Sequence, residues 1–365
     1  MRPDSILREL EKAGFRAYYV GGCVRDTLLG RPVHDWDITT SASPEEMMAL
    51  FPDSLPTGVK HGTVTVRWQG VLAETTTFRS DGAYSDARHP ESVTFVRRLE
   101  DDLARRDFTV NAMAMDLQGN ITDLFGGRED LANGLLRCVG TPEARFSEDA
   151  LRMLRACRFC AQLGFAMEPA TDAAITACAP LAAGLSRERV REEVEKTLLS
   201  PRPEYLNRML ENGLLAACTD VREGALSGLA ALPEAPAVRW AAVLVQLPQL
   251  ELSGFRLPAR LQQLAEAAAA AYRPARSRPE WKALIAERGW ECADTAAQLC
   301  GSSAVEEIRR SGECVTLRQL AVTGRDFPDR QGPEVGRLLQ GLLQHVLRCP
   351  EDNRREILLS LAQAM

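Results

Sequence analysis

The sequence lacks any long hydrophobic run. No stretch of about 18 consecutive apolar residues occurs, so we expect no membrane-spanning helix. The first residues lead directly into an amphipathic segment, without the apolar core of a secretory signal. These absences predict a cytoplasmic protein rather than an exported or membrane-embedded one.

Histidine is scarce, and cysteine follows no regular spacing. The four histidines are too scattered to form the His-Asp cluster of a metal phosphohydrolase. Ten cysteines at irregular intervals are typical of reduced thiols in a chain of this length. The one close pair, Cys157 and Cys160, has no second Cys or His pair at zinc spacing and lies in a helical pattern. We therefore expect these two thiols to pack within a helix.

Lysine is also scarce, with only four among the 44 basic residues. Arginine binds phosphate bidentately, but genome composition explains the preference for arginine more simply. The net charge of −6 argues against indiscriminate binding of nucleic acid, although it permits a local basic surface. With 45% hydrophobic and 26% charged residues, the chain has the composition of an ordinary globular protein.

The first part of the chain combines short β-rich runs with glycine-containing turns. Strands are predicted at residues 16–20 and 36–40. Residues 63–68 and 71–78 are predicted to pair as a hairpin around Gln69-Gly70. This pattern indicates a small mixed sheet.

Helix signals are clear at two places. Ser43, with Pro44 and Glu46 behind it, has the pattern of a capping box and predicts the start of a helix. A longer helix is predicted over residues 147–163, and Gly164 is a natural residue to end it.

Beyond residue 140 the chain becomes rich in Leu, Ala, Arg and Glu, with proline between the helical stretches. We therefore predict an α+β fold in which a head with a small mixed sheet precedes an all-α neck, body and tail. The predicted boundaries are 1–140 for the head, 141–206 for the neck, 207–272 for the body and 273–365 for the tail.

Two aspartates separated by one residue, Asp35 and Asp37, are the first candidates for chemistry. Residues i and i+2 of a strand point to the same face, so both carboxylates would converge on one site. Hard anionic oxygens suit Mg²⁺, and two such ions about 3.5–4 Å apart clamp the attacking hydroxyl and the leaving pyrophosphate in phosphoryl chemistry. Taken alone, such a pair is more often a solvated turn.

A Gly-Gly turn precedes this pair and opens a short predicted helix. Gly21 and Gly22 let backbone N–H groups approach phosphate oxygens, and Arg25 lies on the first turn behind them. The pattern predicts a phosphate cradle, with a simple strand-to-helix turn as the alternative.

A third polar block contains Arg105, Arg106, Asp107 and Asn111. Guanidinium groups bind triphosphates, and Asp107 or Asn111 has the groups to accept from or donate to a ribose. A salt-bridged loop before a strand is an equal alternative.

A fourth block contains Asp149 and Arg152, which lie three residues apart in the predicted helix. This spacing makes them neighbours on one helix face, where an ordinary ion pair is the simplest explanation.

Taken together, these blocks resemble the class II tRNA nucleotidyltransferases, which are the bacterial CCA-adding enzymes and their poly(A) polymerase relatives. The resemblance covers roughly residues 15–205 and implies a head like that of DNA polymerase beta. The order and spacing of the blocks carry it, at residues 21–26, 28–31, 35–38, 57–64, 105–108 and 148–152.

The resemblance implies a role for each matched residue. Asp35 and Asp37 correspond to the carboxylates that bind Mg²⁺, and Glu74 is a third acidic group near the metal. Gly21, Gly22 and Arg25 would hold the triphosphate, Arg106 and Asp107 the phosphate and ribose, and Asp149 and Arg152 the base. The implied nucleotide-binding residues are Gly21, Gly22, Arg25, Arg106, Asp107, Asn111, Asp149, Arg152, Arg155 and Arg158.

The implied reading of the base agrees with the chemistry of Asp149 and Arg152. A carboxylate accepts hydrogen bonds and a guanidinium only donates them. Cytosine and adenine each present an amino donor beside a ring acceptor, so both match the pair. Uracil and guanine would place a carbonyl oxygen against the carboxylate, and polar sites of this kind discriminate by roughly 10⁴-fold. We therefore expect CTP and ATP to be accepted and UTP and GTP to be rejected.

The resemblance also bears on the product. Residues 81–90 resemble the flexible loop that CCA-adding and A-adding members carry and CC-adding members lack. Addition of C, C and A to tRNA is therefore the first expectation, addition of A alone the second and poly(A) synthesis the third. A non-catalytic RNA-binding protein is a rival of another class, but the intact metal-binding aspartates argue against it.

One segment of the predicted tail is a candidate for binding the tRNA. Arginines at residues 273–278, followed by Trp281 and Lys282, have the groups to grip phosphates and stack on RNA. A linker with solvated charges is an equal alternative. The sequence indicates no protein partner.

Overall fold

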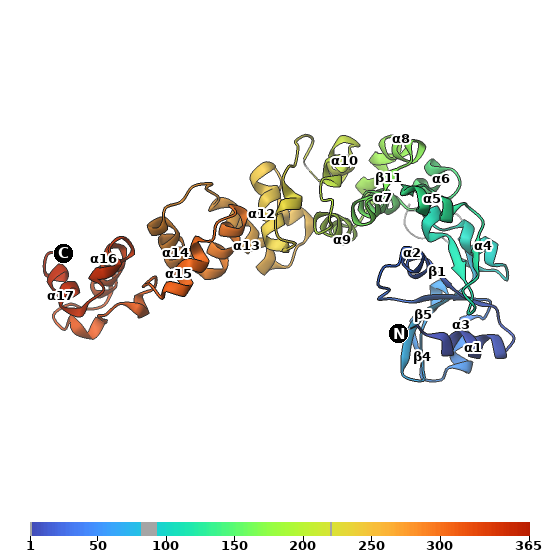
Figure 1. The fold of residues 1–365 in the computed structure, drawn as a ribbon, viewed down its shortest axis with the longest axis horizontal. Helices are drawn as coiled ribbons and strands as arrows, with labels where there is room; N and C mark the ends of the chain where they lie inside the picture. Colours follow the sequence, from blue (N-terminus) through green and yellow to red (C-terminus); the bar gives the residue numbers. More distant parts are fainter. Residues whose placement is uncertain (1, 82–92, 220) are drawn as a thin grey trace. The chain divides into compact units, whose positions relative to one another are not determined.

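The computed structural model describes residues 2–81, 93–219 and 221–365 (Figure 1). The loop predicted at residues 81–90 lies outside these ranges, apart from its first residue. Among the described residues, no helix is long and apolar enough to cross a membrane.

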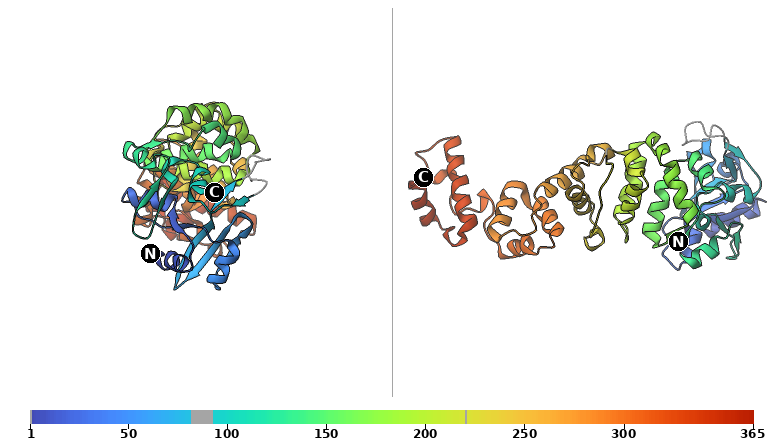
Figure 2. Two further views of the ribbon diagram at one scale, coloured as in Figure 1. Left: turned by 90° about the vertical axis from the view of Figure 1, so that its right-hand side faces the viewer. Right: turned by 90° about the horizontal axis from the view of Figure 1, so that it is seen from above.

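The chain forms two compact units, Met1–Glu223 and Gly224–Met365. The first contains the sheet, and the ribbon after residue 141 is mainly helical in the green to red part of Figures 1 and 2. The predicted α+β class, with a mixed-sheet head and a helical remainder, is confirmed. The four-part division at residues 140, 206 and 272 stays a prediction.

A seven-stranded sheet forms the centre of the head. Its order is β3-β4-β5-β2-β1-β8-β9, in which β2 and β5 are parallel and the other neighbours are antiparallel. The strands are β1 (Ala17–Val20), β2 (Asp37–Thr40), β3 (Leu55–Gly58), β4 (Thr63–Trp68), β5 (Val71–Thr77), β8 (Met113–Met115) and β9 (Ile121–Asp123).

The predicted hairpin is β4 and β5. Gln69 and Gly70 both have positive φ angles, of 49° and 79°, which is the geometry of a type I′ turn. This turn places Trp68 opposite Val71 and fixes the register along the pair.

The helices of the head include the one predicted from its capping box. The amide of Glu46 donates to Ser43 Oγ at 3.2 Å, and the amide of Ser43 donates to the Glu46 carboxylate at 2.7 Å, as predicted. The head helices are α1 (Asp4–Lys12), α2 (Gly22–Leu28), α3 (Pro44–Leu50), α4 (Leu99–Ala104) and α5 (Gly127–Asn133).

Two small sheets lie beside the main one. β6 (Arg79–Asp81) pairs with β7 (Val93–Phe95). β10 (Leu135–Leu136) pairs in parallel with β11 (Ala166–Met167), so the predicted neck is not purely helical: one of its segments adds a strand to the head.

The long helix predicted at residues 147–163 is interrupted. Asp149 has extended dihedral angles (φ −141°, ψ 103°), so α6 ends before it and α7 begins at Leu151. Cys157 and Cys160 are free and buried on α7, as expected. The helices here are α6 (Pro142–Glu148), α7 (Leu151–Leu163), α8 (Pro169–Cys178), α9 (Arg187–Leu198), α10 (Tyr205–Glu211) and α11 (Leu214–Cys218).

The second unit is helical and has its own core. Buried Trp281 and Ile285 pack with apolar residues from the later helices. α14 changes direction at Gly289, whose φ is 81°. The helices are α12 (Pro236–Gln246), α13 (Ala259–Ala270), α14 (Arg278–Leu299), α15 (Ala304–Ser311), α16 (Pro333–Arg348) and α17 (Arg355–Gln363).

Candidate active site

Three acidic side chains gather at one edge of the β2–β5 pair. The parallel register places Asp37 beside Glu74, and residues side by side in a sheet point to the same face. Asp37 is exposed as a residue, yet protein atoms surround its carboxyl group. This burial raises the pKa of Asp37 to about 6, against the effect of Arg106, and the charges of Glu74 and Asp35 raise it further.

The position of Asp35 differs from the prediction in one respect. β2 begins at Asp37, so Asp35 precedes the strand instead of lying two residues along it. The alternation argument for a shared face was therefore wrong in its premise. Asp35 is nevertheless close enough for its charge to raise the pKa of Asp37.

The acidic cluster fits a divalent cation. Burial is the main cause of the raised pKa of Asp37, and the charges of Glu74 and Asp35 add to it, so a bound cation would stabilise the ionised carboxylate. Mg²⁺ takes one or two carboxylates and completes its shell with water and phosphate oxygens. Asp35 and Asp37 supply suitable donors, with Glu74 next to them.

A second group of possible metal ligands lies in the other unit. Among the described residues, His345, Cys349 and Asp352 form the one set whose donor atoms all lie within 4.8 Å of one another. His345 Nε2 and Asp352 Oδ2 are already 2.6 Å apart in a hydrogen bond at the end of α16. This contact accounts for their closeness without a metal, and the group contains neither of the predicted aspartates.

Gly21 brings the backbone close to the acids. Its φ is 74°, and a Cβ atom there would lie 3.2 Å from Nη1 of Arg106 and 3.9 Å from Oδ2 of Asp37. A side chain at this position would therefore be strained and crowded. Gly22 begins α2, as expected for the turn.

Arg25 and Asn111 belong to a buried polar network. Arg25 donates to Oδ1 of Asn111 at 2.7 Å and to Asp26 at 2.9 Å. Asn111 in turn donates to Asp107 at 3.2 Å. The structure thus places Arg25 and Asn111 where they support Asp107.

Asp107 joins the head to α7. Its Oδ2 accepts hydrogen bonds from Nε and Nη2 of Arg155 at 2.9 and 2.6 Å. Burial opposes ionisation of Asp107, but Arg155 and the hydrogen bond from Asn111 outweigh it and lower the pKa of Asp107 to about 2. Asp107 is therefore ionised at neutral pH.

Asp102 forms ion pairs with both Arg105 and Arg106, and it was not predicted as a site residue. Asp102 on α4 is fully buried and accepts from Arg105 at 2.7 Å and from Arg106 at 3.1 Å. Its helix is fixed by Leu99 and Leu103, which pack in the core of the sheet.

We expect Asp102→Asn to destabilise the head by about 3 kcal/mol, because it removes the charge that compensates two partly buried guanidinium groups. Chemical denaturation measures this, with Asp101→Asn as the exposed neighbour for comparison. Equal stability of the two variants would show that Asp102 does not anchor the arginines.

Two adjoining clefts carry the predicted site residues. The first, which we call the acid cleft, has a volume of about 220 Å³ and includes Asp37 and Glu74. The second, the arginine cleft, has a volume of about 320 Å³. It is lined by Arg79, Arg105, Arg106, Asp107, Asp149, Leu151, Arg152, Arg155 and Arg189.

Three arginines, Arg79, Arg105 and Arg106, line both clefts, so the clefts are neighbours with a shared wall. Nε of Arg106 is buried and has no hydrogen-bond partner among the described residues. A buried donor of this kind is unfavourable until an acceptor arrives, and phosphate oxygens are suitable acceptors. The site therefore combines acids for a cation with arginines for a triphosphate.

Asp149 and Arg152 line the arginine cleft together, but they do not pair with each other as the helix spacing suggested. Asp149 accepts from Arg189 at 2.9 Å, and Arg152 donates to Glu148 at 2.5 Å. Arg152 also donates to the carbonyl oxygen of Arg105 at 3.0 Å. The expectation of an i,i+3 helix pair is wrong because the helix breaks at Asp149.

The structure gives the two further predicted arginines, Arg155 and Arg158, different surroundings. Arg155 lines the cleft and binds Asp107. Arg158 is directed elsewhere: it pairs with buried Glu193 of α9, and its guanidinium lies 4.0 Å from the centre of the Phe159 ring. The structure therefore gives Arg158 a part in joining α7 to α9.

Arg189 and Glu148 also contact the predicted base-reading residues, although neither was predicted as a site residue. Glu148 precedes Arg152 by four residues, and this spacing is a usable signal for an ion pair. Arg189 lies 40 residues from Asp149 in the chain, so no local pattern connects them.

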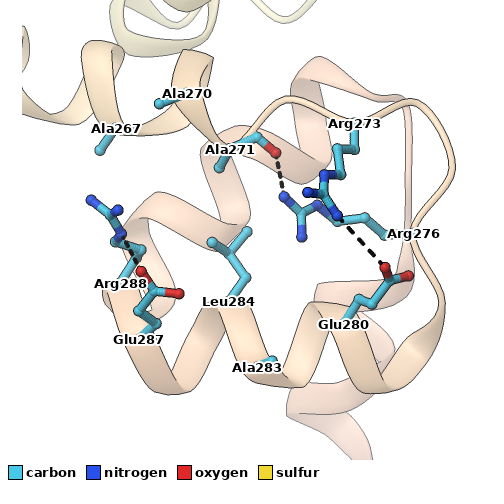
Figure 3. Close-up of a pocket in the computed structure, with 10 residues that line it drawn as sticks. All are labelled: Ala267, Ala270, Ala271, Arg273, Arg276, Glu280, Ala283, Leu284, Glu287 and Arg288. Atoms are coloured by element: carbon cyan, nitrogen blue, oxygen red, sulfur yellow. Dashed lines mark hydrogen bonds and ion pairs between the residues drawn. The ribbon is translucent and has the colours of Figure 1, made fainter.

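The predicted RNA-contacting segment of the tail is only partly available. Trp281 and Lys282 are buried, and Lys282 pairs with Glu313 at 2.9 Å, so the expectation that these two contact RNA is wrong. Arg273 and Arg276 border a separate hollow of about 340 Å³ (Figure 3).

This hollow lies between α13 and α14 and is lined mainly by alanines, arginines and two glutamates. Arg276 donates to the carbonyl oxygen of Ala271 at 2.6 Å, and Arg273 lies 3.8 Å from Glu280 (Figure 3). Each of its two glutamates pairs with an arginine, Glu280 with Arg273 and Glu287 with Arg288, and none of the predicted acids lines it, so it is a separate surface feature and not the active site.

The chain matches two protein-family models. Residues 17–137 match the Poly A polymerase head domain, and residues 164–218 match the probable RNA and SrmB- binding site of polymerase A. The first match spans the seven-stranded sheet, including β2 with Asp37 and β5 with Glu74.

Curated relatives and solved structures match over nearly the whole chain. The CCA-adding enzyme of Geobacillus kaustophilus is 41% identical, over 96% of this chain and 93% of that protein. The CCA-adding enzyme of Enterococcus faecalis is 39% identical, over 98% and 94%. The Bacillus stearothermophilus CCA-adding enzyme, solved in complex with CTP, has a TM-score of 0.81 and 38% identity, over 100% of this chain and 98% of that one.

A more distant structure, the Thermotoga maritima CCA-adding enzyme with tRNA, shares the fold at a TM-score of 0.66 and 20% identity. The near-complete coverage by relatives at about 40% identity agrees with the acidic cluster and the arginine cleft. The chain therefore belongs to the CCA-adding enzyme family of nucleotidyltransferases.

Proposed function

We propose that the chain adds C, C and A in turn to the 3′ end of tRNA, using CTP and ATP and releasing pyrophosphate. The observation that carries the proposal is that Arg79, Arg105 and Arg106 line both the acid cleft and the arginine cleft. The carboxylates suit a divalent cation, and the arginines next to them suit the triphosphate of a nucleotide. Because its substrates are tRNA and nucleoside triphosphates, we propose that the protein works in the cytoplasm.

Asp35 and Asp37 are the proposed Mg²⁺ ligands, and Glu74 adds negative charge next to them. When bound, the cation supplies charge stabilisation for the attacking and leaving oxygens. The protein's own contribution is to hold Asp37 beside Glu74 by the β2–β5 pairing, with Asp35 just before β2.

The arginines position the triphosphate. Arg105 and Arg106 are held by Asp102, and Arg155 is held by Asp107, so their guanidinium groups are fixed before the nucleotide arrives. Fixed donors of this kind stabilise developing negative charge without reorganisation. In the reaction the tRNA 3′ oxygen bonds to the α-phosphorus, and the bond to the leaving pyrophosphate breaks.

Asp149 and Arg152 are proposed to read the base. Both residues line the arginine cleft. A carboxylate has about four acceptor sites, so Asp149 has more of them than the contacts with Leu151 and Arg189 use. Asp149 would accept from the amino group of cytosine or adenine, and Arg152 would donate to the neighbouring ring acceptor. Gly21, Gly22 and Arg25 remain the residues proposed to hold the triphosphate, and Gly21 lies beside Arg106 and Asp37.

The product is tested with three tRNAs that end in the discriminator base, in C and in CC. We expect CTP to extend the first two and ATP to extend only the third, and addition to stop after A. Gel analysis of labelled products measures this. Extension of the CC-ending tRNA alone would indicate an A-adding enzyme, a long A tract a poly(A) polymerase, and no extension at all an RNA-binding protein.

A further inference from the structure

Arg189 lies on α9, outside the motifs that carry the family resemblance. Its Nη2 atom donates to Oδ2 of Asp149 at 2.9 Å. Side-chain exposure is 26% for Arg189 and 19% for Asp149, so the pair is largely shielded from solvent. Both residues line the arginine cleft, in which the base of the nucleotide is proposed to lie.

Two donors fix the carboxylate of Asp149. The amide of Leu151 donates to Oδ1 at 3.0 Å, and Arg189 donates to Oδ2. With both oxygens held, the carboxylate has one orientation, and its remaining acceptor sites have defined directions. Without Arg189, the carboxylate would lose the donor that fixes Oδ2 and keep the amide of Leu151 on Oδ1, so its orientation would be less restricted.

Arg189 itself is held in place by its helix. Val190 and Val194 of α9 are buried, and Glu193 pairs with Arg158 of α7. α9 is thereby attached to the helix that carries Arg152 and Arg155. The position of the Arg189 backbone is therefore set by packing and not by the ion pair alone.

A second observation points to a ligand. Nη1 of Arg189 is buried and has no hydrogen-bond partner among the described residues. Since an unpaired buried donor is unfavourable, this atom has unused capacity to donate to a ligand acceptor. It belongs to a side chain that lines the same cleft as Asp149.

We propose that Arg189 is a positioning residue that sets nucleotide choice by fixing the carboxylate of Asp149. In this orientation Asp149 accepts from the amino group of cytosine or adenine and meets the carbonyl oxygen of uracil or guanine unfavourably. The inference rests on the proposed function, because it requires the base to face Asp149.

The test measures kcat/KM for CTP and for UTP, separately, on tRNA that ends in the discriminator base. Arg189→Ala is expected to lower the CTP-to-UTP ratio roughly 10- to 100-fold, the value of one charge-assisted hydrogen bond. Arg189→Lys should restore part of the ratio, because it keeps the charge but not the planar fork. Arg187→Ala, an exposed arginine on the same helix, should keep the wild-type ratio.

An unchanged CTP-to-UTP ratio in Arg189→Ala would overturn the inference. If kcat/KM falls equally for both nucleotides, the ratio is unchanged and Arg189 has a structural role only. If Arg189→Ala does not fold, Arg189→Gln takes its place and the same ratio decides. A wild-type protein that adds no CTP would contradict the proposed function itself, so the two failures are distinguishable.

Discussion

Replacing Asp37 with asparagine is expected to lower the rate of CTP addition about 1,000-fold, which corresponds to losing several kcal/mol of charge stabilisation at the reacting phosphate. The substitution keeps the size of the side chain but removes one charge from the acidic cluster. Stability should not fall, because burial, together with the charges of Glu74 and Asp35, outweighs Arg106 and disfavours the ionised form of Asp37, as its raised pKa indicates. Single-turnover incorporation of labelled CTP into tRNA without CCA measures the rate.

Two further variants serve as a second test and a control. Asp35→Ala should lose activity in the same way, although Asp35 lies outside the strand. Asp53→Asn, an exposed aspartate elsewhere in the head, should keep it. Full transfer by Asp37→Asn or by Asp35→Ala would remove that residue from the metal site.

Replacing Asp149 with alanine is expected to reduce discrimination against UTP and GTP from roughly 10⁴-fold to within about 10-fold. The change removes the acceptor for the amino group and, with it, the repulsion of a carbonyl oxygen. Competition between labelled CTP and UTP on the same tRNA measures this. The overall rate should fall as well, because Arg189 loses its partner.

Asp149 gives a cleaner test than Arg152. Arg152→Ala would also remove one of the two arginines that pair with Glu148 and the contact with the backbone of Arg105. Glu143→Ala on α6, an exposed acid, is the matched control. If Asp149→Ala still rejects UTP as strongly as the wild type, Asp149 does not read the base.

Local signals were enough for much of the fold. The capping box at Ser43 and the turn at Gln69-Gly70 depend on neighbouring residues, and both form as predicted. The mixed sheet and the helical remainder follow from hydrophobic patterns with periods of about 2 and 3.6 residues. Such patterns do not depend on distant contacts.

The break at Asp149 shows where local reasoning fails. The apolar period continues through this position, and neither Gly nor Pro marks a boundary. Aspartate is a favoured residue at helix starts, and its Oδ1 does accept from the amide of Leu151 at 3.0 Å. The contact with Arg189, far along the chain, also favours the extended conformation, and no periodic pattern contains this information.

The site combines both kinds of information. The family resemblance selects Asp37 and Glu74, but only the parallel register of β2 and β5 shows why they are neighbours. Asp102 and Arg189 act through other side chains, and their importance becomes visible only from burial and contacts.

The structure of the protein with Mg²⁺ and CTP, determined by crystallography, tests the central assignment most directly. We predict the metal on the carboxylates of Asp35 and Asp37, the triphosphate along Arg105 and Arg106, and the amino group of cytosine within hydrogen-bonding distance of Asp149. A metal bound away from both aspartates, or a cytosine outside the arginine cleft, would contradict it.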